Sequence, residues 1–226
     1  MAPYKPPAPD VARALAKLPL LVDSQVVVFP RLRVQLVVRE PRQLQLVSDV
    51  LGTHRAVGIG QPPESVAEGA ESAQLCGVGA VGTIVEAAPI AGGRGQLVVI
   101  GRGRIKLSAL VAAGPCPYPR AMATVLPSLD TAVTPGELAA LHHEAERFAS
   151  IMSKRDPGFR YRVPDDPDPG FVADHAAHAM IIDPRHRQTI LETLDVRERV
   201  LRVAELLMLQ SSALDEEPQS GSGGLN

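Results

Sequence analysis

The sequence contains no tryptophan and few aromatic residues of any kind. Only 3% of its 226 residues are aromatic, namely three tyrosines and four phenylalanines, whereas 45% are hydrophobic. That hydrophobic content is ordinary for a globular protein, and the length is sufficient for a substantial core. The core must therefore be built mainly from valine, leucine, isoleucine and alanine.

Cysteine is equally scarce. Cys76 and Cys116 are the only two, and they form neither a disulfide framework nor a C-x-x-C pair. A reducing compartment is therefore expected. Residues 1–10 lack the apolar segment of a signal peptide, and no run approaches the roughly 18 apolar residues of a membrane-spanning helix. We expect a cytoplasmic protein without a membrane partner.

Motifs for nucleotide chemistry are also missing. No G-x-x-x-x-G-K-[ST] loop occurs, so no segment is suited to hold ATP phosphates. Gly77–Gly82 matches G-x-G-x-x-G by letter, but the residues after it, TIVEAAPIAGG, are β-branched and then interrupted by proline and glycine. A dinucleotide site needs a helix there, because the helix N-terminus meets the pyrophosphate. We therefore predict no cofactor and no catalytic residue.

The histidines raise a metal-binding hypothesis. His175 and His178 would share one helix face, and His142-His143 form an adjacent pair. Neither an H-E-x-x-H motif nor a cysteine accompanies them, so we interpret them as surface or neutral histidines and not as metal ligands. We predict no metal ligand, and a metal hydrolase is retained as a third hypothesis behind two binding functions.

Short apolar segments separated by glycines dominate the first half of the chain. A short helix is predicted from Asp10 to Leu18, a second helix from Pro41 to Gly52, and strands at 26–29, 32–36, 56–60, 75–90, 96–107 and 121–126. Ala91–Gly95 is typical of a hairpin turn, and the glycines at 77, 79 and 82 suit the bends of a small barrel. So many short strands favour a barrel or sandwich over a parallel sheet.

Beyond Pro127 the pattern changes to amphipathic helices. Helix starts with capping residues are predicted at Thr134, Asp168, Asp183 and Asp195. Apolar stripes at 138–152 and 196–207 would face a core. The predicted organisation is an N-terminal extension (1–17), a β domain (18–128), a helical bundle (129–210) and a disordered tail (211–226).

Three groups of motifs occur in one order along residues 18–210. The first is Lys17–Arg42, KLPLLVDSQVVVFPRLRVQLVVREPR. The second joins VGAVGTI at 78–84 to VVIGRGRI at 98–105, which contains G-x-x-R, and to the Pro117-Tyr118 pair. The third joins ADH at 173–175 to QTILETLDVRER at 188–199. Together they resemble the N-terminal substrate-binding domain of Lon proteases.

This resemblance implies an α+β fold, in which a PUA-like small β-barrel is followed by a C-terminal α-helical bundle. It also implies recognition of protein or peptide segments. Because the ATPase and peptidase regions of Lon are not in this sequence, we expect a stand-alone, non-catalytic module, not an enzyme, that serves as an adaptor in protein quality control. Candidate partner-binding residues, chosen from the matched segments, are Phe29, Arg31, Leu32, Arg102 and Arg104.

The sequence departs from the family's pattern at three positions. Arg39 and Gln43 flank E-P-R where the family often has aromatic residues, and Ile105 continues the G-x-x-R strand where an aromatic residue is common. If such rings capture substrates, the specificity of this protein differs from that of the family. If they are core residues, their replacement is compensated nearby.

Charge is unevenly distributed along the chain. The net charge is −2, but residues 1–128 hold 13 basic against 8 acidic residues, and residues 129–226 hold 10 against 17. Arg94, Arg102, Arg104 and Lys106 form a basic cluster, so RNA binding through a basic PUA-like barrel is the alternative function. No aromatic residue stands nearby to stack on bases. A solvated strand face, or an acidic protein surface, is the other explanation of the cluster.

Overall fold

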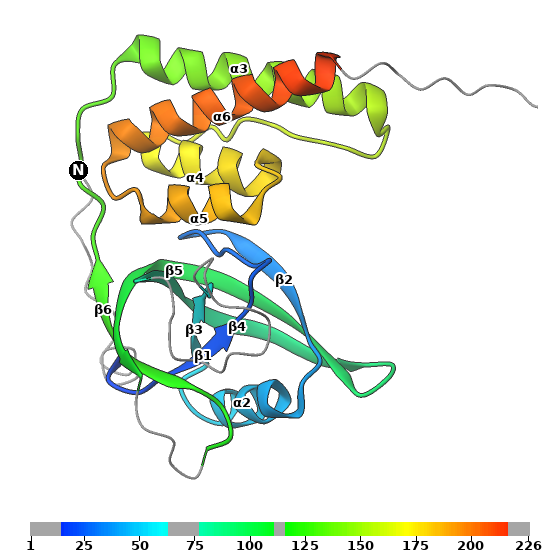
Figure 1. Cartoon of the computed structure of the whole chain (residues 1–226), viewed down its shortest axis with the longest axis vertical. Helices are drawn as coiled ribbons and strands as arrows, with labels where there is room; N and C mark the ends of the chain where they lie inside the picture. The colour runs from blue at the N-terminus through cyan, green and yellow to red at the C-terminus, as the bar shows by residue number, and fades with distance from the viewer. Residues whose placement is uncertain (1–14, 63–76, 111–115, 217–226) are drawn as a thin grey trace, which may run out of the picture. The chain divides into compact units, whose positions relative to one another are not determined.

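The computed structural model describes residues 15–62, 77–110 and 116–216 (Figure 1). These residues form a six-stranded sheet and five helices, so the predicted α+β class is confirmed. Packing divides the chain into two units. One contains Met1–Ser128 together with Asp183–Leu194, and the other contains Leu129–Ile182 together with Asp195–Asn226. Of the domain boundaries predicted along the chain, those after residues 17 and 128 stay a prediction.

The first unit contains all the described strands. They are β1 (Leu18–Val22), β2 (Arg33–Val38), β3 (Ala56–Gly60), β4 (Val78–Ile90), β5 (Arg94–Leu110) and β6 (Arg120–Leu126), and helix α2 (Pro41–Leu51) follows β2. The strand order is β2-β5-β4-β3-β1-β6. Because β6 also pairs with β5, the strands β1, β3, β4, β5 and β6 close a ring of pairings. The first half of β5 pairs with β2 and its second half with β6.

Two predictions near the start of the described chain are wrong. The sequence predicts a strand at Val26–Phe29 and the end of a helix at Leu18, but the strand is β1 and Val26–Phe29 is irregular. Val27, Val28 and Phe29 are nevertheless buried, which accounts for their apolar pattern. Arg31 has a φ of 69°, and the Leu32 N–H donates to the Phe29 carbonyl, so a turn separates this segment from β2. An apolar run alone does not distinguish a strand from other buried segments.

Two of the glycines predicted at bends are needed where strands approach closely. A Cβ at Gly79 would lie 2.6 Å from the Ile59 carbonyl oxygen, and a Cβ at Gly82 would overlap a methyl group of Val99. The ladder between β4 and β5 shifts register between Val81 and Gly82. Since a register shift bends and twists a strand, Gly82 lies where β4 changes direction.

Helix α5 (Pro184–Glu192) belongs to the strand unit. Arg104 Nε donates to the Leu191 carbonyl at 2.8 Å, and Gln188 Nε2 donates to the Val78 carbonyl at 2.8 Å. Arg104 is 2% exposed and Gln188 is also buried. Because buried polar groups require partners, these bonds fix α5 on the strands. The last arginine of the G-x-x-R motif therefore supports the fold.

The second unit is a bundle of α3 (Pro135–Arg155), α4 (Pro169–Met180) and α6 (Val196–Glu216). The helix starts predicted from capping residues are confirmed. At Thr134, the hydroxyl accepts from the Glu137 N–H and the Glu137 carboxylate accepts from the Thr134 N–H. The predicted apolar stripes supply the core of the bundle, through Leu141, Ala145 and Phe148 of α3 and Val200, Val203 and Leu207 of α6.

Helix α6 continues to Glu216, past Ser211, where the sequence predicts the start of a disordered tail. That boundary is wrong for residues 211–216. Ser211 is buried, and Asp215 forms an ion pair with Arg147 of α3 at 2.9 Å. Packing against α3 therefore extends a helix whose local sequence is polar. The rest of the predicted tail lies outside the described residues.

The two halves of the third sequence motif meet inside the bundle. Asp174 on α4 and Arg199 on α6 form an ion pair with a distance of 3.5 Å between Nε and Oδ1. Their side chains are 5% and 1% exposed. Gly170 leaves the space for the guanidinium, because a Cβ there would lie 3.0 Å from Arg199 Nη2. This pair joins α4 to α6.

Candidate functional site

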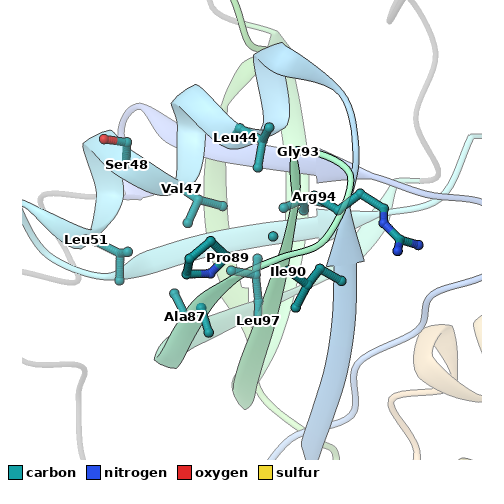
Figure 2. Close-up of a pocket in the computed structure, with 13 residues that line it drawn as sticks. Leu44, Val47, Ser48, Leu51, Ala87, Pro89, Ile90, Gly93, Arg94 and Leu97 are labelled. Atoms are coloured by element: carbon teal, nitrogen blue, oxygen red, sulfur yellow. The ribbon is translucent and has the colours of Figure 1, made fainter.

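An apolar groove lies between α2 and the hairpin of β4 and β5 (Figure 2). Its volume is about 560 Å³. The helix contributes Leu44, Val47 and Leu51, and the hairpin contributes Ala87, Pro89 and Ile90. Figure 2 shows these side chains entering the same space from the two elements. Such a lining is suited to apolar side chains and offers little for acid–base chemistry.

The sequence of α2 explains its side of the groove. The helix begins with Pro41 and ends before Gly52, as predicted. Leu46, Val47 and Val50 are buried, and Leu44 and Leu51 are half-buried. The apolar stripe of α2 thus extends beyond the residues that are buried in the core. Leu44 and Leu51, at the edge of this stripe, line the groove.

The hairpin side of the groove is an apolar arm that stays exposed. Residues 87–89 of β4 are exposed, and glycines 92–93 make the turn with φ of 77° and 68°, a conformation that glycine adopts readily. Gly95 is buried beside the helix. A Cβ there would lie 3.0 Å from Val38 and 3.2 Å from Leu44, so a larger residue would crowd the groove.

Among the lining residues, Arg94 is the one that carries a charge. Its Nε donates to the Ala91 carbonyl at 2.9 Å, which folds the side chain over its own turn. The guanidinium lies at the rim of the groove in Figure 2. A carboxylate at this end of a bound segment would gain an exposed ion pair, which is worth about 0–1 kcal/mol.

The five predicted partner-binding residues lie outside this groove. Phe29 and Leu32 are buried, and Arg104 holds α5. Arg31 and Arg102 are exposed, and Arg102 Nε donates to the Thr83 hydroxyl at 3.0 Å. Two of the five thus present their side chains to solvent, and a role in binding stays a prediction for all of them.

The basic cluster predicted for RNA binding is interrupted in the structure. Arg104, its central member, is buried, whereas Arg102 and Lys106 on either side are exposed. Arg94 lies at the groove instead. Nucleic-acid binding depends on a set of cations that reach phosphates together. The arrangement of these residues gives the RNA alternative no support.

Gln43 and Ile105, which depart from the family's aromatic pattern, have structural roles. Gln43 Oε1 accepts from the backbone N–H groups of Arg39 at 3.2 Å and Glu40 at 3.4 Å, which caps the start of α2. Ile105 is fully buried, in a core cluster with Leu18 and other apolar residues. Arg39 is exposed. The replacement at 105 is therefore a core substitution.

His175, one of the histidines that raise the metal-binding hypothesis, lies in an aromatic cluster of the bundle. The His175 ring lies 5.4 Å from that of Tyr161 and 6.0 Å from that of Phe171, measured between centroids. Burial lowers the pKa of His175 and raises the pKa of Tyr161 to about 12. Within the described part of the chain, no three His, Cys, Asp or Glu side chains come together as metal ligands.

The groove is not evident from the sequence. One signal was present on each side, in the apolar margin of α2 and in the apolar segment Ala87–Ile90 just before a glycine turn. Each signal has an ordinary explanation by itself. Their juxtaposition comes from the pairing of β2 with β5, which brings the helix after β2 next to the hairpin.

The fold and its motifs define a class of substrate-binding domain. The family model described as the ATP-dependent protease La (LON) substrate-binding domain matches residues 17–208. The chain therefore belongs to this family, which confirms the resemblance seen in its motifs. None of the helices in the described ranges is both long and apolar enough to span a membrane.

Individual relatives agree with this assignment. The Lon protease of Roseiflexus castenholzii is 30% identical over 207 residues, which cover 88% of this chain and 24% of that protein. The chain thus spans about a quarter of the length of the curated relatives it matches.

Two solved structures share the fold. The N-terminal domain of the Mycobacterium avium complex Lon protease has a TM-score of 0.65 and 19% identity, covering 85% of this chain and 98% of that one. The Lon N-terminal domain protein from Xanthomonas campestris has a TM-score of 0.58 and 17% identity, covering 89% and 99%.

Proposed function

We propose that this protein is a non-catalytic module that binds protein or peptide segments. The observation that carries the proposal is the match to a substrate-binding family over residues 17–208. The apolar groove between α2 and the hairpin supports it by offering a place for such a segment. We further propose that the ring of strand pairings is a small PUA-like barrel, and that the module acts as a cytoplasmic adaptor in protein quality control.

Binding in the groove would rest on burial of apolar side chains from the partner. The volume of about 560 Å³ is within the range of roughly 300–1,000 Å³ that is typical of ligand sites. Each apolar side chain that becomes fully buried contributes about 1.5–3 kcal/mol. Unfolded polypeptides expose such side chains and folded proteins mostly hide them. The module should therefore prefer unfolded polypeptides.

Fluorescein-labelled casein, an unfolded polypeptide, tests this proposal in an anisotropy titration. Ile90→Asp places a charge in the apolar groove, so Kd should rise about tenfold or more. Met122→Asp is the matched control, because Met122 is 51% exposed on β6 and does not line the groove. Its Kd should stay within about twofold.

The two possible failures have different meanings. If the unaltered chain does not bind casein, the proposed function is wrong. If it binds casein but Ile90→Asp and Met122→Asp bind it equally well, the function stands and the groove is not its site.

A further inference from the structure

Within the described part of the chain, strand β2 has one edge that pairs with no other strand. Among the described residues its one strand partner is β5, in an unbroken register from Arg33 opposite Ile100 to Val38 opposite Gly95. Just before β2, the Gly101 N–H donates to the Leu32 carbonyl at 2.9 Å. Backbone groups alternate in direction along an antiparallel ladder. Those of residues 34, 36 and 38 therefore face β5, and those of residues 33, 35 and 37 face the unpaired edge.

Apart from the charge of Arg33, β2 lacks the features that usually protect the edge strands of natural proteins. Proline, register shifts and inward-pointing charges usually prevent pairing with other chains. The β2 segment RVQLVV contains no proline, and its pairing with β5 shows no shift. Its one charged side chain, Arg33, points outward and pairs with Glu86 at 2.6 Å. In the described part of the chain, no backbone hydrogen bond is formed along this edge.

We propose that the unpaired edge of β2 binds an extended peptide segment by β-strand addition. This inference rests on the proposed function and states how the chain of a substrate would be held. The edge presents N–H and carbonyl groups at the spacing of a strand. The backbone of another extended segment can form hydrogen bonds with these groups. Unfolded segments can supply that backbone, and folded domains mostly cannot.

Side chains around β2 define the segment that fits best. A small hollow of about 30 Å³ is lined by Val37 and Val38 of β2 and by Leu21 and Val22 of β1, and Asp23 and Gln43 add polar groups to it. The strand is flanked by the exposed side chains of Arg31 and Arg39. The occupant is therefore an extended segment with small apolar side chains at alternate positions and acidic residues at its ends.

Gln35→Pro removes one outward N–H without removing a hydrogen bond to β5. Proline is tolerated on an edge strand when the missing N–H faces solvent. The affinity of the Gln35→Pro variant for fluorescein-labelled casein should fall about tenfold or more. One backbone hydrogen bond to the added strand is lost, and the proline ring obstructs that strand. Gln35→Ala keeps the backbone and should bind within about twofold of the unaltered chain. Val34→Pro removes an N–H that faces β5 and should lower the melting temperature.

A second measurement keeps the protein unaltered. The probe is a fluorescein-labelled peptide of alternating valine and threonine with a glutamate at each end, compared with the same peptide N-methylated on alternate amides. Tighter binding of the unmethylated peptide by about tenfold supports strand addition. Equal affinities, or no binding of either peptide, overturn it. This pair of peptides decides the question if Gln35→Pro does not fold.

The remaining outcomes separate the edge from the proposed function. Casein binding that is unchanged in folded Gln35→Pro overturns the edge as the site and leaves the proposed function intact. No casein binding by the unaltered chain overturns both. A dimer of the unaltered chain that Gln35→Pro abolishes in sedimentation experiments would assign the edge to a second copy of this chain and overturn the peptide proposal.

Discussion

Replacement of Arg199 by alanine tests whether a buried ion pair joins two helices of the bundle. The side chain of Arg199 is 1% exposed, and that of its partner Asp174 on α4 is 5% exposed. The distance between Arg199 Nε and Asp174 Oδ1 is 3.5 Å. The alanine variant leaves the Asp174 carboxylate buried without this cation. Removing one partner of a buried ion pair costs about 3–5 kcal/mol, and we expect a loss of that size in the free energy of unfolding of the helical unit.

Arg202→Ala provides a matched control on the same helix. Arg202 pairs with Glu198 at 2.8 Å, but these side chains are 37% and 56% exposed. An exposed pair four residues apart on a helix contributes about 0.3–0.5 kcal/mol. The loss in Arg199→Ala should therefore be roughly ten times that in Arg202→Ala.

Urea unfolding followed by far-ultraviolet circular dichroism measures both losses. Tryptophan fluorescence is not an option, because the chain contains no tryptophan. A double variant, Asp174→Leu with Arg199→Met, removes both charges and should recover part of the stability, since no unpaired charge remains buried. Equal stability of Arg199→Ala and Arg202→Ala would refute the role of the pair. A double variant as unstable as Arg199→Ala would attribute the loss to packing.

Two further substitutions test close packing and pH dependence. Gly101→Ala should destabilise the strand unit by about 1–3 kcal/mol, because a Cβ would overlap the Phe29 carbonyl, whereas Gly103→Ala has open space and should change the melting temperature little. Equal melting temperatures would contradict this reasoning. Hydrogen bonds from Arg197 and from a backbone N–H lower the pKa of Glu137 from 4.5 to about 2. Its stabilising effect is complete above about pH 4.5 and is lost as the pH falls towards 2. Glu137→Gln should thus weaken the acid dependence of thermal unfolding, and an unchanged dependence would count against it.

Helix positions could be predicted from local sequence, whereas one strand could not. The start of α3 is set by Thr134 and Glu137, which bond to each other's backbone within one turn, so the signal acts before any tertiary contact. β1 is a strand because Leu18–Val22 pairs with β3 and β6. Val26–Phe29 is just as apolar but has no such partner, and its sequence does not reveal the difference.

The sequence by itself determined the family, the α+β class and the helix starts, because motif order and capping are written along the chain. Only the tertiary structure decided which side chains are accessible. Arg102 and Arg104 are two residues apart in one motif, yet Arg102 is exposed while Arg104 is buried and bonded to Leu191 of α5. The groove likewise needs α2 beside the hairpin of β4 and β5. Burial depends on what packs against a residue, and here those partners come from distant parts of the chain.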